Sequence, residues 1–143
     1  MTIFEALRED HMIQRKLLEA LLDTSGESEL RRTLYQDLKQ QLEDHATAEE
    51  RYFYVPLIEL DSTVEIARHG VAEHHVIDEL IEDLDEIDMS SPAWMAKLKK
   101  LNETVNHHLD DEEHGFFQIA GRHLSEKEKE KLANEYQEEM RAA

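Results

Sequence analysis

Apolar residues recur along most of the chain at spacings of three, four and seven, the period of helices with one buried face. In the first segment they share that face with one histidine, the whole set being Phe4, Leu7, His11, Leu18 and Leu21. Only four Gly and two Pro interrupt a sequence rich in Leu, Ile, Ala and Val. Such a mixture favours long helices over short strands. The pattern therefore predicts an all-α fold.

Capping signals place the first two helices. Thr2 and Glu5 have the T-x-x-E spacing of a capping box, which predicts a helix that ends in the run 23–28. The second helix is predicted from about Leu30 to Leu60, and Pro56 should kink or end it, since proline lacks the amide proton that an interior turn needs.

Three further helices follow. The S-x-x-E spacing of Ser62 and Glu65 predicts another capping box, opening a helix that reaches about Ile87. Ser91 followed by proline predicts a fourth helix, which extends to about Ala120. The spacing of Ser125 and Glu128 predicts a shorter fifth helix over about 126–140, whose Glu and Lys content indicates a solvated face that packs lightly.

The two halves of this arrangement repeat at an offset of 63 residues. DHMIQRKLL at 10–18 matches EHHVIDELI at 73–81, and HATAEERYF at 45–53 matches HLDDEEHGF at 108–116. Each half is a helical hairpin, and repeats of this kind indicate architecture before any single motif does. We therefore expect one domain, 1–143, in which an up-down-up-down antiparallel four-helix bundle spans about 3–120 and the short fifth helix ends the chain.

The repeat also relates six residues that can bind metal. Its two His-x-x-x-Glu motifs place both side chains on one helix face, about one turn apart. The six candidate ligands are His11, His45, Glu49, His74, His108 and Glu112. By symmetry one ion would take the first two histidines and the other ion the last two, with both carboxylates bridging. Imidazole combined with carboxylate suits iron better than magnesium or calcium, so we expect two non-haem iron ions.

Less specific interpretations of these residues remain. One histidine on an apolar helix face is more often a hydrogen-bonded core residue, but six residues at one offset argue against that. His107-x-x-x-Asp111 is a rival register, although it breaks the repeat. His69 is expected at the surface, and Glu50 and Glu113 just off the ligand face. A ferritin-like centre would use four carboxylates and two histidines in Glu-x-x-His order, the reverse of what is present here.

The composition of the chain limits the kinds of partner and site that we expect. A net charge of −18 repels phosphate backbones and anionic lipids, so we expect neither nucleic-acid nor membrane partners. The absence of Cys excludes disulfides, thiolate ligands and iron–sulfur clusters. The N-terminal residues lack a basic region before an apolar run, and no window approaches the roughly 20 apolar residues of a membrane span. A cytoplasmic location is the expectation.

Four motifs resemble the hemerythrin-like family, also called the HHE cation-binding domain, across residues 3–120. They are D-H at 10–11, H-x-x-x-E-E at 45–50, E-H at 73–74 and H-x-x-x-E-E at 108–113. The resemblance implies a four-helix bundle with a non-haem di-iron centre. It also implies activity in binding or sensing a small molecule such as O2 or NO, or in iron and peroxide handling.

One departure from the family's oxygen carriers bears on function. Those carriers have a fifth histidine four residues from the ligand of the third helix, whereas position 70 here is Gly and position 78 is Asp. Tyr52, three residues after Glu49, is a candidate additional ligand, with core packing as the alternative. Two functions remain open: a protein that binds or senses its ligand, and an enzyme that decomposes hydrogen peroxide. The missing histidine slightly favours the enzyme, because open coordination positions favour turnover.

Overall fold

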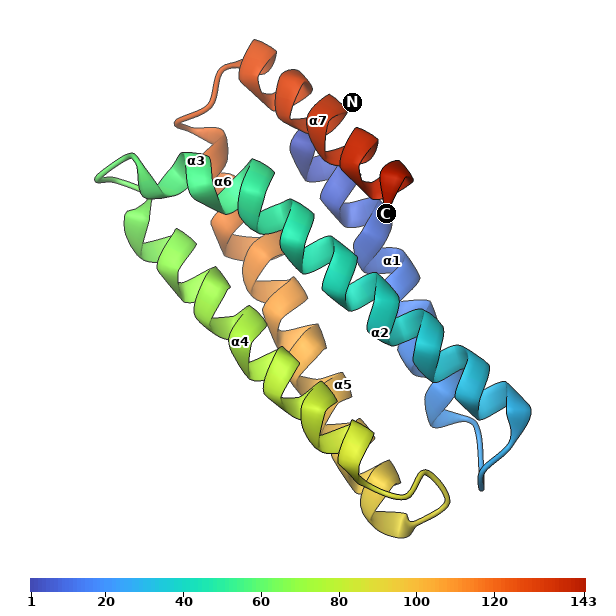
Figure 1. Cartoon of the computed structure of the whole chain (residues 1–143). Helices are drawn as coiled ribbons and strands as arrows, with labels where there is room; N and C mark the ends of the chain where they lie inside the picture. The colour runs from blue at the N-terminus through green and yellow to red at the C-terminus, as the bar shows by residue number, and fades with distance from the viewer.

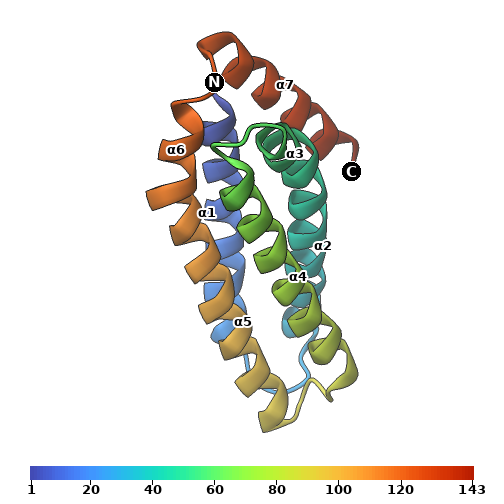
Figure 2. The same ribbon diagram turned by 90° about the vertical axis from the view of Figure 1, so that its left-hand side faces the viewer.

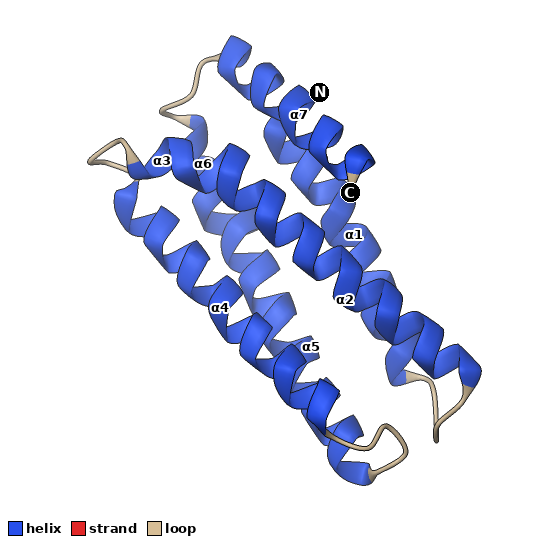
Figure 3. Ribbon diagram, viewed as in Figure 1, coloured by secondary structure: helices blue, strands red, loops and turns tan.

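The computed structural model describes residues 1–143 as a bundle of long antiparallel helices without strands (Figures 1 and 3). The four bundle helices are α1 (Ile3–Leu22), α2 (Glu29–Glu49), α4 (Val64–Glu86) and α5 (Pro92–Asp111). Shorter elements extend or cover them: η1 (Glu50–Tyr54), α3 (Val55–Ile58), η2 (Glu112–Phe116), α6 (Phe117–Gly121) and α7 (Glu126–Ala142). The predicted all-α bundle with a fifth helix is confirmed. None of its helices combines the length and apolar character that crossing a membrane requires.

Most of the predicted helix starts are present. Capping boxes form at Thr2 and at Ser125, and the Ser91 side chain accepts a hydrogen bond from the backbone of Trp94. The capping box predicted at Ser62 is wrong, because α4 begins one residue later and has Thr63 at its N-cap without a side-chain cap. The Thr63 hydroxyl instead donates to the Leu57 carbonyl at 2.6 Å, at the end of the preceding helix, where carbonyls lack helical partners.

Two π-helical turns lengthen the helices that carry the His-x-x-x-Glu motifs. In η1 the Val55 amide bonds to the Glu50 carbonyl five residues back, and in η2 the Phe117 amide bonds to the Glu112 carbonyl. Pro56 lies just after η1 in the first turn of α3, so it does not end the helix, which continues to Ile58. A π turn holds one more residue than an α turn, so every later side chain moves to a different helix face.

The core consists of two apolar clusters with a polar layer between them. One cluster surrounds Trp94 near the α1–α2 and α4–α5 loops, and the other surrounds Phe53 and Phe117 near the opposite end. Nine polar or charged residues are buried, and six of these are the candidate ligands. Burying so many ionisable groups is unfavourable unless each has a partner.

Helix α7 lies across α1 and α2 at the end of the bundle that contains the N-terminus (Figure 2). Its composition predicted light packing, but Ala133 and Tyr136 are almost completely buried against the bundle. The opposite pair of helices, α4 and α5, makes no comparable contact with α7. The two halves of the repeat therefore differ in how they are covered.

Candidate metal centre

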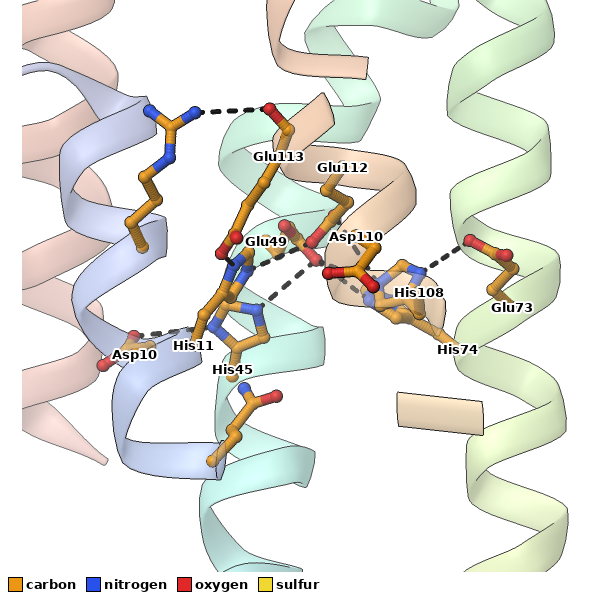
Figure 4. Close-up of polar contacts among 12 residues, drawn as sticks. Asp10, His11, His45, Glu49, Glu73, His74, His108, Asp110, Glu112 and Glu113 are labelled. Atoms are coloured by element: carbon orange, nitrogen blue, oxygen red, sulfur yellow. Dashed lines mark hydrogen bonds and ion pairs between the residues drawn. The ribbon is translucent and has the colours of Figure 1, made fainter. Parts of the chain in front are cut away.

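The six predicted ligands come together in the middle of the bundle, from all four of its long helices and the start of η2. His11 projects from α1, His45 and Glu49 from α2, and His74 from α4. His108 lies on α5, and Glu112 begins η2. All six are at most 5% exposed. Figure 4 shows His11 and His45 on one side, His74 and His108 on the other, and the two glutamates between them.

Each histidine directs Nε2 at a central carboxylate. The Nε2 atom of His11 lies 3.1 Å from Oε1 of Glu112, and that of His74 lies 2.9 Å from Oε1 of Glu49. His45 and His108 approach the glutamate of their own helix at 3.5 Å each. The donor atoms form two sets of four that share both glutamates: His11, His45, Glu49 and Glu112, and Glu49, His74, His108 and Glu112. The structure thus brings together the same two groups of candidate ligands that the repeat indicated.

The other ring nitrogen of each histidine faces a second acidic residue. Nδ1 of His11 donates to Glu113 at 2.6 Å, and Nδ1 of His108 donates to Glu73 at 2.7 Å. Nδ1 of His74 lies 3.7 Å from Glu50. A proton held on Nδ1 leaves the Nε2 lone pair free to point inward, as metal-binding histidines require.

His45 is held in the same way, with one added group. Its Nδ1 donates to the Tyr136 hydroxyl, which in turn donates to Asp10. Asp10 and Glu73 are equivalent under the repeat. Tyr136 could not be identified as a neighbour of the centre from the repeat, because α7 lies outside it.

Buried polar atoms without partners test whether a metal pair fits this site. The inward-facing Nε2 atoms of all four histidines have no hydrogen-bond partner, and neither do both oxygens of Glu49 and Oε1 of Glu112. Folded proteins rarely leave such atoms unpaired. Four imidazoles and two carboxylates that converge on shared points match the coordination chemistry of iron. The residues present therefore fit a pair of iron ions.

The charges at the centre also favour a bound cation. Burial opposes a charge on the His45 imidazole, but the Glu49 and Asp10 carboxylates outweigh it and raise its pKa to about 10. Burial and the Glu49 charge raise the pKa of Glu112, whereas the surrounding imidazoles overcome burial and hold the pKa of Glu49 well below its usual value. The carboxylates thus favour positive charge at the positions where metal cations would replace protons.

Comparison with known proteins agrees with this geometry. Residues 2–120 match a family model described as the Hemerythrin HHE cation binding domain. The chain belongs to the hemerythrin HHE cation-binding family. Its fold is similar to the crystal structure of a hemerythrin HHE cation binding domain-containing protein from Mycobacterium kansasii. The TM-score is 0.90 over 99% of this chain and 86% of that chain, at 20% sequence identity, which establishes the fold alone. A search of curated proteins found no match.

In this hemerythrin-family chain the tyrosine of η1 that reaches the centre is Tyr54, not Tyr52. Tyr52 is half-buried against the neighbouring apolar cluster, with Arg51 over its ring, and the structure does not bring it to the ligands. Tyr54 is completely buried, and its hydroxyl donates to Oε2 of Glu112. The π turn causes this difference, since the face of Glu49 is next reached five residues later and not after three or four. Pro56, which follows this turn, was the feature of the sequence that could have indicated an irregular helix here.

Tyr54 makes the two halves of the centre unequal. Its repeat equivalent is Phe117, which lacks a hydroxyl and stacks on His11 with ring centroids 6.0 Å apart. At Gly70 there is no side chain, and a β-carbon there would overlap the Tyr54 ring. Tyr54 therefore fills the space beside position 70 of α4.

The rival register on α5 does not enter the centre. His107 and Asp111 pair with each other at 3.3 Å on the outside of the bundle, where His107 is exposed.

A small cavity of about 10 Å³ borders the centre inside the bundle. It is lined by Gln14, Leu42, His45, Ala46, His74, Ile77, Asp78 and His108. A cavity of this size has room for about one water molecule.

Proposed function

We propose that this hemerythrin-family chain is a non-haem di-iron protein whose centre binds or senses a small molecule such as O2 or NO. The observation that carries the proposal is the pair of four-donor sets, which share Glu49 and Glu112 and leave every inward-facing histidine nitrogen unpaired. His11 and His45 would hold one ion, and His74 and His108 the other. The two glutamates would bridge them and offset their charge.

The surrounding residues have separable roles in this proposal. When bound, the iron pair supplies redox chemistry and coordination positions that the six side chains do not fill. Glu113 and Glu73 accept from Nδ1 of His11 and His108, and Tyr136 accepts from Nδ1 of His45, so these three groups fix the orientation and tautomer of those rings. The apolar clusters on both sides exclude bulk water, and the adjoining cavity has room for about one water molecule.

Tyr54 supports a second candidate function, the decomposition of hydrogen peroxide. Its hydroxyl donates to Glu112 at the edge of the centre and so holds a proton beside a proposed bridging ligand. Decomposition of two H2O2 molecules to two H2O and one O2 consumes no external proton, but protons must move between the peroxide oxygens, and a buried hydroxyl beside the centre can transfer them. The Tyr54 hydroxyl oxygen would be the candidate additional iron ligand, the role for which the sequence analysis considered Tyr52.

Iron stoichiometry tests the centre. Anaerobic loading with ferrous iron should give two irons per chain by elemental analysis, and both His45→Ala and His108→Ala should lose iron. His75→Ala is the matched control, because His75 is exposed and pairs only with Glu79 on its own helix. One iron or fewer in the unmodified protein, or zinc retained in preference to iron under equal supply, would contradict the proposal.

Spectroscopy and gas measurement separate the two functions. A stable visible spectrum that forms with O2 and disappears under vacuum would support reversible binding. Rapid oxygen evolution on adding hydrogen peroxide to the iron-loaded protein, absent from His108→Ala, would support the enzyme.

A further inference from the structure

A second group of histidines and carboxylates lies outside the bundle, between the neighbouring helices α4 and α5. It combines two more His-x-x-x-acid pairs, His69 with Glu73 on α4 and His107 with Asp111 on α5. Both histidines are exposed, whereas the Glu73 and Asp111 side chains are 15% and 29% exposed. We call these four residues the surface cluster.

The surface cluster converges on two carboxylate oxygens. Nε2 of His69 lies 3.2 Å from Oε2 of Glu73 and 3.7 Å from Oδ2 of Asp111. Nε2 of His107 lies 3.3 Å from the same Asp111 oxygen and 3.9 Å from the same Glu73 oxygen. Donor atoms of His69, Glu73 and Asp111, from two helices, lie within 4.8 Å of one another, and His107 adds a further nitrogen beside the same two carboxylates.

Its surroundings also favour a cation. The Glu73 and Asp111 carboxylates both face Nε2 of His69, and two negative charges that face one group attract a cation. The His69 ring is held by an edge-on contact with Phe116, with centroids 5.6 Å apart. A hollow open to solvent adjoins three of the four residues, so an ion could enter without movement of the backbone.

Glu73 joins the surface cluster to the interior centre. Its Oε2 faces His69 and His107, while its Oε1 accepts the hydrogen bond from Nδ1 of His108. One carboxylate therefore lies between the solvent-exposed group and a proposed iron ligand.

The other half of the repeat has no such cluster. The positions equivalent to His69, His107 and Asp111 are Ala6, Asp44 and Ala48. There α7 covers the surface, and Tyr136 contacts the Glu73 equivalent, Asp10. The surface cluster thus lies on the half that α7 leaves open, where an ion could approach.

We propose that His69, Glu73, His107 and Asp111 form a solvent-open site for a divalent transition-metal ion, which takes up ferrous iron before it enters the interior centre. The choice of iron rests on the proposed function, whereas the existence of the site does not. Two imidazoles and two carboxylates are ligands for Fe²⁺, Co²⁺ and Zn²⁺ alike. The net charge of −18 raises the local concentration of any such cation.

Cobalt binding to the iron-loaded protein tests the site. Titration with Co²⁺ should show one additional ion per chain by calorimetry and by cobalt absorption, and the double variant His69→Ala/His107→Ala should lose it while keeping its two irons. His75→Ala is the control, since His75 forms the same i,i+4 pair with Glu79 on α4, at 2.9 Å, without a facing helix. No additional cobalt in the unmodified protein, or equal binding by the double variant, would overturn the site.

The rate of iron loading tests the entry role. Metal-free protein mixed with Fe²⁺ should fill severalfold more slowly in the double variant and reach the same two irons at the end. An unchanged loading rate would refute the entry role. A protein that holds two irons but binds no additional cobalt refutes the surface site alone. A protein that never holds two irons refutes the interior centre instead.

Discussion

The ring of Tyr54 lies so close to Gly70 that a β-carbon at position 70 would overlap it. Tyr54 belongs to η1, which follows α2, whereas Gly70 belongs to α4. The oxygen carriers that this chain resembles have a fifth histidine four residues from the ligand of the third helix, and position 70 is one of the two positions that correspond to it. In this chain a tyrosine from the neighbouring helix delivers a hydroxyl to Glu112 from that place. Glycine at 70 is therefore required by packing.

Gly70→Ala should destabilise the protein. Replacing glycine inside a helix by alanine normally stabilises it by up to about 1 kcal/mol, but forcing a methyl group against a packed ring typically costs about 1–3 kcal/mol. We expect a net loss of stability in urea unfolding of the metal-free protein. Tyr54→Ala should remove the clash, so Gly70→Ala should stabilise a chain that already carries Tyr54→Ala. A single variant as stable as the unmodified protein would show that Tyr54 can leave this space.

The fold and the convergence of the six candidate ligands were predictable because the repeat reports them twice. His-x-x-x-Glu lies within a regular α-helix up to Glu49 and Glu112, so α-helical spacing placed both motifs correctly. The same α-helical spacing wrongly placed Tyr52 on the ligand face, three residues after Glu49. The π turn η1 holds one extra residue, and the pattern of apolar positions did not indicate it. Tyr136 lay outside the repeat, and the Ser62 cap was displaced by a tertiary bond from Thr63 to Leu57. Local periodicity therefore predicted what local structure determines, and missed contacts made between distant segments.

Tyr54→Phe and Tyr52→Phe should differ in the iron-loaded protein. If the Tyr54 oxygen binds ferric iron, the unmodified protein should show a broad phenolate-to-iron band in the visible spectrum. Tyr54→Phe should remove that band and leave two irons per chain, because the four histidines and two glutamates remain. Tyr52→Phe should leave the band intact, since Tyr52 packs away from the ligands. A band lost in Tyr52→Phe and kept in Tyr54→Phe would contradict the placement of both side chains.

The stability of the metal-free protein should fall as pH rises above 6.5. Neighbouring carboxylates raise the pKa of His45 from 6.5 to about 10, so the folded state binds a proton that the unfolded state releases. This contribution is fully present below pH 6.5 and is lost as pH rises through 10. The raised pKa of Glu112 acts in the same direction. The free energy of unfolding of the metal-free protein, measured by urea, should fall by at least about 1 kcal/mol between pH 6.5 and 9.

The iron-loaded protein is the control for this pH dependence. Metal-bound imidazoles are neutral and hold no proton to release, so its urea midpoints should change much less over the same range. Equal pH dependence in both forms would show that groups outside the centre cause it.

Tyr136→Phe should weaken iron binding from a helix that supplies no ligand. The Tyr136 hydroxyl accepts from Nδ1 of His45 and donates to Asp10, so removing it leaves the ring less firmly oriented and one nitrogen poorly paired. Loss of such an outer partner typically lowers metal affinity by about 10- to 100-fold, and loss of a buried hydrogen bond costs about 1–3 kcal/mol of stability. Competition with a chelator would measure the affinity. Tyr35→Phe is the matched control, because its buried hydroxyl donates to Asp85 at 2.7 Å within the other apolar cluster. That variant should lose similar stability and keep its iron affinity. If both variants weaken iron binding equally, the effect comes from general destabilisation, and Tyr136 does not orient His45.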